Sequence, residues 1–148
     1  IPRELYVATL DSRTTPICSS LDGNIYPVGT GPIPPIHINC RSLRVPVIDG
    51  RRLGSRPAVT ATDRQLAGLT GTARQRALDR MVGRVPAGTT YQQWLSGQNT
   101  SFQNEVLGPT RAKLFRAGEI DLGGFVDQYL PQLLKNICFA IPLGIVFR

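Results

Sequence analysis

The placement of proline constrains this chain more than any other feature of its sequence. Eight of the twelve prolines lie within residues 1–57, and three of them fall in residues 29–35. Proline fixes φ and lacks the backbone donor that helices and sheet ladders need. This part of the chain therefore predicts short strands joined by irregular loops. With 148 residues, the whole chain is long enough for one domain with an ordinary hydrophobic core.

Three short runs in the proline-rich part have the composition of strands. They are residues 5–10, residues 24–28 and residues 43–48, each bounded by turn-forming residues. We expect the last run to be an edge strand, because Pro46 interrupts it. Residues 51–62 contain little that a core can bury, and they predict a linker or an exposed arm.

From residue 63 onward the apolar residues recur at helical spacing. We expect a first helix that starts at Thr62 or Asp63 and ends at Gly83 or Pro86, with a middle that Gly68 and Gly71 weaken enough to allow a break. Shorter helices are expected to begin near Thr90, Thr100, Pro109 and Asp121, with Trp94, Phe102 and Phe115 as core residues.

The fold predicted by these patterns is α+β: a small N-terminal strand-and-loop unit followed by several short helices. We divide the chain into a strand and loop unit (1–50), a basic linker (51–62) and a helical region (63–148), which together form one domain. The helical region ends in an apolar tail over residues 137–147. We expect this tail to pack on its own domain or on a partner. It is too short to span a bilayer, and no run of eighteen apolar residues occurs in the chain.

The charge of the chain is strongly basic and carried almost entirely by arginine. Fifteen arginines and two lysines give a net charge of +7 and a pI near 10. Such a charge is compatible with binding a polyanion, and equally with a generic basic surface. Arg74, Arg76, Arg80 and Arg84 give the first helix a partly basic face, which also suits plain solvation.

The cysteines and the single histidine form the most informative constellation. His37 lies three residues before Cys40, and Cys18 lies beyond the intervening turn. Thiolate and imidazole are the ligands that zinc prefers, and Asp11 is the natural fourth ligand. A zinc ion would supply folding energy to a proline-rich segment. Three interpretations remain open: a structural zinc site, a reduced or disulfide-linked pair of Cys18 and Cys40, and unrelated roles for these residues.

The same residues also suggest a catalytic alternative. A cysteine beside His37 has the makings of a nucleophile, as in a hydrolase or a transferase. The sequence offers no evident orienting group or oxyanion hole for it. This alternative predicts an open cleft with access to water, whereas a closed site argues against it.

Residues 7–48 contain two distinctive stretches, LDSRTTPIC and PPIHINCR. This segment resembles the phage head-morphogenesis proteins, the minor head proteins of the phage Mu F-like family. A second block over residues 91–127 is also similar to the C-terminal part of this family. The residues that match in the first block are Leu10, Asp11, Arg13, Thr14, Cys18, Gly23, Pro34, Pro35, His37, Cys40 and Arg41. Many members end this block with Cys-Arg-Cys, whereas Ser42 follows Arg41 here.

The resemblance implies a structural, non-enzymatic protein of the virion. Such proteins lie inside the head, associated with the portal or the capsid, and act in head assembly or in DNA packaging and delivery. The host cytoplasm is then the place of assembly. Family members usually carry a helical region ahead of this block, so we expect the chain to be part of a longer one. Packed double-stranded DNA would lie close by, and Arg51, Arg52 and Arg56 are suited to contact its phosphates. A sequence-independent DNA-binding module is the alternative.

Overall fold

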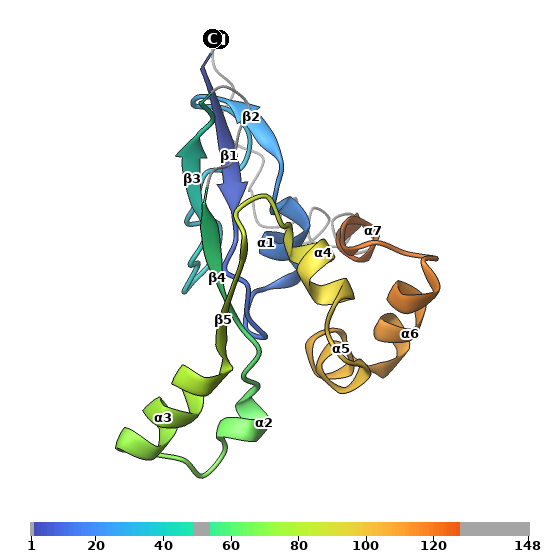
Figure 1. Ribbon diagram of the computed structural model, residues 1–148. Coiled ribbons are helices and arrows are strands. Elements are labelled where there is room, and N and C mark those ends of the chain that lie inside the picture. Colours follow the sequence, from blue (N-terminus) through green and yellow to red (C-terminus); the bar gives the residue numbers. More distant parts are fainter. Residues whose placement is uncertain (1, 49–53, 128–148) are drawn as a thin grey trace, which may run out of the picture.

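The protein has an α+β fold, and its described residues form two small antiparallel sheets and seven helices. The computed structural model describes residues 2–48 and 54–127 (Figure 1). The predicted fold class is therefore confirmed. The elements are β1 (Arg3–Val7), α1 (Pro16–Leu21), β2 (Ile25–Pro27), β3 (Leu43–Pro46), β4 (Ser55–Val59), α2 (Asp63–Leu66), α3 (Gly71–Met81), β5 (Val82–Pro86), α4 (Tyr91–Ser96), α5 (Thr100–Leu107), α6 (Pro109–Ala117) and α7 (Leu122–Asp127).

The first sheet has the order β2-β1-β3, with β1 antiparallel to both neighbours. Leu5 and Tyr6 of the central strand are both buried, which explains the dense apolar run at this point of the sequence. β3 is an edge strand, as predicted, and Pro46 lies at its end, where a missing donor costs least.

The second sheet corrects the prediction of a linker over residues 51–62. Residues 55–59 form β4, which pairs along its whole length with β5. A single parallel bridge between Leu10 and Ala58 connects this ribbon to the segment after β1. The sequence predicts a linker because Ser55, Arg56 and Pro57 have low intrinsic strand propensity. Pairing with β5 stabilises the strand in spite of this low propensity.

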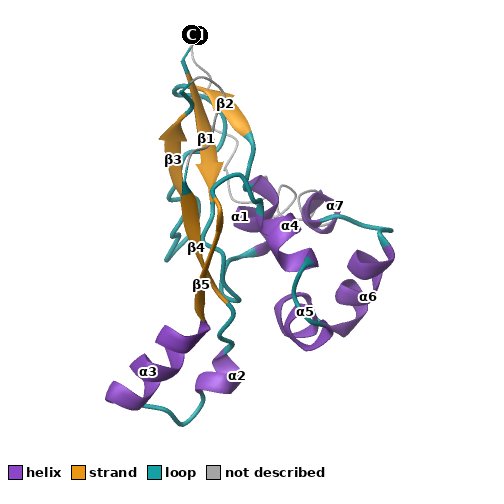
Figure 2. Ribbon diagram, viewed as in Figure 1, coloured by secondary structure: helices purple, strands orange, loops and turns teal. Residues whose placement is uncertain are grey.

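The predicted first helix is interrupted in its middle, where its glycines allow a break, and its end differs from the prediction. It breaks into α2 and α3 at Gly68, which has a φ of +76°, and its expected last residues belong to β5 instead. No residue of α3 is buried, so the apolar face predicted for it does not pack on a core. Figure 2 shows α2 and α3 at the far end of the β4–β5 ribbon, away from the other helices.

The helices after residue 90 begin where the sequence predicted. Thr90 closes a capping box with Gln93 at the start of α4, and Asn99 caps α5. Pro109 occupies the first turn of α6, which ends at Gly118 in the left-handed conformation. α1 packs against α4 and α7, which joins the helices after residue 90 to the N-terminal strand unit. The expected tail over residues 137–147 lies outside the described residues.

Two hydrophobic clusters make up the core. The larger one contains the predicted core residues Trp94, Phe102 and Phe115, and the ring of Trp94 packs edge to face against those of Tyr91 and Phe102. The smaller one joins Tyr6 and Cys18 under the first sheet, so one candidate ligand is itself part of the core.

Candidate metal centre

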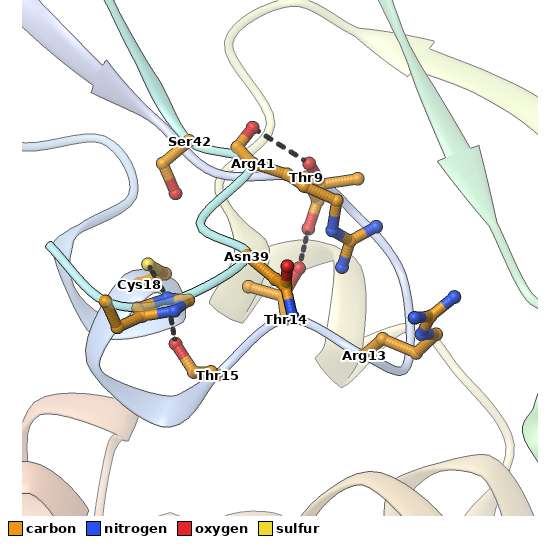
Figure 3. Close-up of a pocket in the computed structure, with 9 residues that line it drawn as sticks. Thr9, Arg13, Thr14, Thr15, Cys18, Asn39, Arg41 and Ser42 are labelled. Carbon is orange, nitrogen blue, oxygen red and sulfur yellow. Dashed lines mark hydrogen bonds between the residues drawn. The ribbon is translucent and has the colours of Figure 1, made fainter. Parts of the chain in front are cut away.

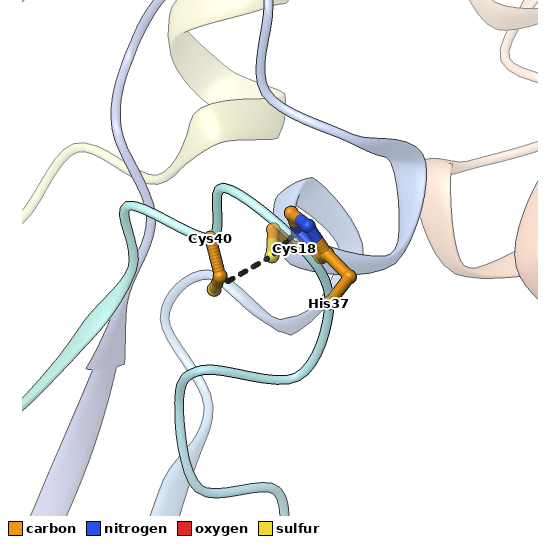
Figure 4. A group of neighbouring side chains, drawn as sticks. All are labelled: Cys18, His37 and Cys40. Carbon is orange, nitrogen blue, oxygen red and sulfur yellow. Dashed lines mark hydrogen bonds between the residues drawn. The ribbon is translucent and has the colours of Figure 1, made fainter.

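Three predicted ligands meet at one point between α1 and the loop that joins β2 to β3 (Figure 4). Cys18 projects from α1, where it is buried, while His37 and Cys40 come from the loop. Their ligand atoms all lie within 4.8 Å of one another, so the group can hold a metal ion. Cys18 Sγ lies 3.0 Å from His37 Nε2 and 3.8 Å from Cys40 Sγ. Both cysteines are free thiols.

The ring of His37 is oriented with its Nε2 atom toward the thiols. Its Nδ1 lies 2.8 Å from the carbonyl oxygen of Ile38, which can only accept a hydrogen bond. Nδ1 therefore carries a hydrogen, and Nε2 presents its lone pair to the group when the ring is neutral. Metal-binding histidines are commonly fixed in this way by a backbone carbonyl. The hydroxyl of Thr15 lies 2.9 Å from the same nitrogen.

The surroundings of Cys18 favour its thiolate. Burial raises the pKa of this thiol, but hydrogen bonds from Ser42, Tyr6 and Thr15 outweigh burial and lower the pKa from its usual value. The hydroxyl of Tyr6 lies 3.3 Å from Cys18 Sγ. Burial raises the pKa of Tyr6 well above its usual value, so this phenol stays protonated and can donate. Thiolate is the form of cysteine that binds metal ions.

Asp11 does not join the three ligands, and its prediction as the fourth ligand is wrong. Its carboxylate holds the guanidinium of Arg41 through two hydrogen bonds, and it also accepts from Thr14 and from the backbone of Arg13. Burial raises the pKa of Asp11, but the bonds and charge of Arg41 outweigh it and lower the pKa below its usual value. Because Arg41 directly follows Cys40, Asp11 positions the loop that carries two of the ligands.

The predicted phosphate contact by Arg56 is corrected as well. Its side chain is buried and donates two hydrogen bonds to the carboxylate of Asp22, with Nη1 3.0 Å from Oδ2. Two further donors reach the carbonyl oxygens of Ala8 and Thr89. Both terminal nitrogens of this guanidinium are therefore engaged within the fold. Arg51 and Arg52 lie outside the described residues.

The hollow beside the ligands is very small. It has a volume of about 10 Å³, roughly one water-sized sphere. Polar side chains dominate its wall, among them Thr14, Thr15, Asn39 and Arg41 (Figure 3). Such a space admits an ion or a water molecule. A tetrahedral ion bound by three side chains has a fourth position that water or a neighbouring hydroxyl can take.

Several residues that build the site escaped the sequence prediction. Tyr6 and Thr15 contact the ligands directly. Arg41 belongs to the family block, but the sequence predicts no role for it at the site. The adjacency of Arg41 to Cys40 is the one local signal that singles it out. Nothing in the sequence indicates the contacts of Tyr6 or Thr15, since both depend on how α1 packs beneath β1.

Comparison with known proteins adds no relative. The sequence matches no protein-family model, and no curated protein or solved structure is similar enough to count as a match. Among the described residues, no helix combines the length and the apolar character needed to cross a membrane.

Proposed function

We propose that this chain is a structural, non-enzymatic minor head protein of a phage virion. It associates with the portal or the capsid interior and acts in head assembly or in DNA packaging and delivery. The observation that carries the proposal is the convergence of the residues on which the family resemblance rests. The two halves of the first block, residues 10–18 and residues 34–41, form one unit through Asp11 with Arg41 and Cys18 with His37. A motif with such long-range contacts behaves as one structural element.

The same unit supports a structural role over a catalytic one. Cys18 Sγ and His37 Nε2 lie within hydrogen-bonding distance of each other, and the adjoining hollow has room for about one water molecule. A nucleophile needs space for the substrate beside it. The carboxylate of Asp11 is engaged by Arg41 and Thr14 rather than by the ring of His37.

We propose further that Cys18, His37 and Cys40 bind a structural Zn²⁺. Two Zn–S bonds of about 2.3 Å at a tetrahedral angle place the sulfur atoms about 3.8 Å apart. The sulfur atoms of Cys18 and Cys40 are 3.8 Å apart in this structure. His37 Nε2, 3.0 Å from Cys18 Sγ, has to withdraw by roughly half an ångström, because Zn–S and Zn–N bonds require about 3.5 Å.

The virion proposal is tested by quantitative mass spectrometry of purified particles. Peptides of this chain are counted in full particles, empty procapsids and particles that have ejected their DNA. We expect a few copies per particle. Copies lost on ejection indicate delivery with the genome, and copies retained throughout indicate a portal-linked part. Absence from all three kinds of particle overturns the proposal and revives the enzyme hypothesis.

The zinc proposal is tested by metal analysis of the purified chain. We expect one zinc per chain, lost in both the Cys40→Ser and the His37→Gln variants. Ile38→Ser is the matched control, because this side chain lies between the two ligands in sequence and is 89% exposed. A chain that binds no zinc under reducing conditions, or variants that bind as much as the parent, would contradict the site.

A further inference from the structure

The most unusual surface of the molecule is the projecting part formed by β4, α2, α3 and β5, residues 55–86, which we call the arm. Its two strands pair with each other along their whole length, and its two helices lie at the far end of the ribbon (Figures 1 and 2). The β4–β5 ribbon therefore holds α2 and α3 away from the other helices, where a binding partner can reach them.

The longer of these helices, α3, buries none of its eleven residues. A helix on the surface of a globular domain normally covers the core with an apolar stripe. α3 has only half-buried apolar positions, such as Leu78 and Met81. Most of its surface is therefore open to a binding partner.

The open surface of the arm is basic. Arg76 and Arg80 lie one helical turn apart, both are exposed, and neither makes a hydrogen bond or ion pair with any residue in the described part of the chain. Arg64 and Arg84 add two exposed charges beyond the ends of α3. Like charges at this spacing destabilise a helix by a few tenths of a kcal/mol, and a bound anion removes that cost.

The composition of the arm favours phosphate over protein as its partner. The core of a protein interface is depleted in charge and enriched in aromatic residues. On the arm, Val82 is the one large apolar residue that stands out as exposed, and the region contains no aromatic side chain. Arginine in turn matches the oxygen pairs of a phosphate with two parallel donors.

We propose that the arm binds the phosphate backbone of double-stranded DNA through Arg76 and Arg80, without reading its sequence. An α-helix fits the major groove or lies along the backbone, and the ribbon holds α3 where it can do either. This inference deepens the proposed function and rests on it for one point, the identification of the DNA as packaged genome. It also replaces Arg56, whose two terminal nitrogens are engaged within the fold.

The test is a fluorescence-anisotropy titration of the full chain with a short duplex of mixed sequence, at several salt concentrations. The Arg76→Gln/Arg80→Gln variant is compared with the Arg3→Gln/Lys113→Gln variant. The second variant removes the same charge from exposed positions on β1 and α6. Circular dichroism verifies that both variants fold.

We expect the arm variant to bind roughly tenfold or more weakly at 0.1 M salt, and its log–log salt slope to fall by about 1.8, or 0.9 per lost phosphate contact. The control variant should keep the parent's slope. Equal losses in both variants would reduce the effect to net charge and overturn the proposal, as would a parent chain that binds no duplex at low salt.

Two further probes separate DNA from other anions. Vesicles of phosphatidylserine and phosphatidylcholine in equal parts, or polyglutamate at equal charge, should compete poorly with the duplex. A stronger arm-dependent interaction with either one overturns the proposal in favour of a membrane or an acidic protein. None of these outcomes alters the count of chains in virions, so the two proposals fail separately.

Discussion

At the scale of single residues, Asp22 organises more of the fold than any candidate ligand does. Its buried carboxylate accepts hydrogen bonds from the backbone of Ala8 at 2.7 Å and of Tyr91 at 2.6 Å. It also accepts two from Arg56, whose side chain is buried beside it. β1, β4 and the start of α4 are thus held by one side chain. A buried charge pair is costly to break because the remaining partner loses its compensation.

The Asp22→Asn variant should therefore be strongly destabilised. The substitution leaves the guanidinium of Arg56 buried without a counter-charge, and we expect a loss of about 3–5 kcal/mol in the free energy of unfolding. Urea denaturation measures this loss. Asp79→Asn, which changes an exposed carboxylate on α3, is the control and should stay within about 0.5 kcal/mol of the parent. Similar losses in the two variants would show that Asp22 does not have this role.

Asp11 provides a second prediction at this scale, a dependence of stability on pH. Its pKa in the folded chain is lowered below the usual 3.8, since Arg41 outweighs the effect of burial. The contribution of this carboxylate to stability is therefore present above about pH 4 and is lost as the pH falls through the lowered pKa. Urea denaturation between about pH 2 and 6 should show a shallower acid slope in Asp11→Asn than in the parent. Parallel curves for the two proteins would contradict the Asp11–Arg41 pairing.

At the scale of elements, the starts of α2, α3 and α4 show that the same residue type caps one helix and leaves another uncapped. Thr62 and Thr90 close complete capping boxes, whereas Thr70, at the start of α3, makes no capping bond through its side chain. The residue type is the same at all three positions. The geometry of the preceding turn decides whether the hydroxyl reaches the backbone of the helix.

These two kinds of helix start predict different costs for the same substitution. Thr90→Ala should lower the free energy of unfolding by about 1 kcal/mol, the usual value of an N-cap. Thr70→Ala, which removes no capping bond, should have an effect of only a few tenths of a kcal/mol. Thermal unfolding of both variants measures the difference, and a larger loss in Thr70→Ala would contradict it.

At the scale of the whole molecule, the candidate metal centre is mechanically joined to the helical core. The hydroxyl of Tyr91 donates to the carbonyl oxygen of Asp11 at 2.7 Å, and Asp11 holds Arg41 next to Cys40. The Asp22 carboxylate and the bridge between Leu10 and Ala58 provide two more connections. A change in stability at the metal centre should therefore also change the stability of the larger core cluster around Trp94.

Zinc should consequently stabilise the whole chain in a single transition. At a free zinc concentration 100 times the Kd, binding to the folded state contributes about 2.7 kcal/mol. For a chain of this size, that raises Tm by about 5–10 °C. Calorimetry and the fluorescence of Trp94 should report the same shift, which a chelator reverses. A zinc effect on one of two separate transitions would show that the two clusters unfold independently.

Much of the local structure followed from the sequence because the signals are themselves local. Pro109 starts α6 and Gly118 ends it, because each residue has the backbone preference that its position requires. The spacing of His37 and Cys40 within one loop indicated a metal site. The resemblance of residues 7–48 to a family block pointed to the segments that come together. It remains the only indication of a virion role.

What the sequence alone determined, then, is the α+β class, the edge position of β3, the helix starts after residue 90 and three ligands of the candidate metal centre. Tertiary structure decided the rest, because it depends on pairs of residues far apart in the chain. β4 exists only because β5 pairs with it, and Arg56 became a buried partner of Asp22 rather than a phosphate contact. Asp11 likewise bound Arg41 instead of a metal, since the fold brings a guanidinium from thirty positions further along the chain to its carboxylate. Periodicity and spacing indicate which side chains can share one face of a helix or strand. Only the folded chain determines which charged side chains pair with each other.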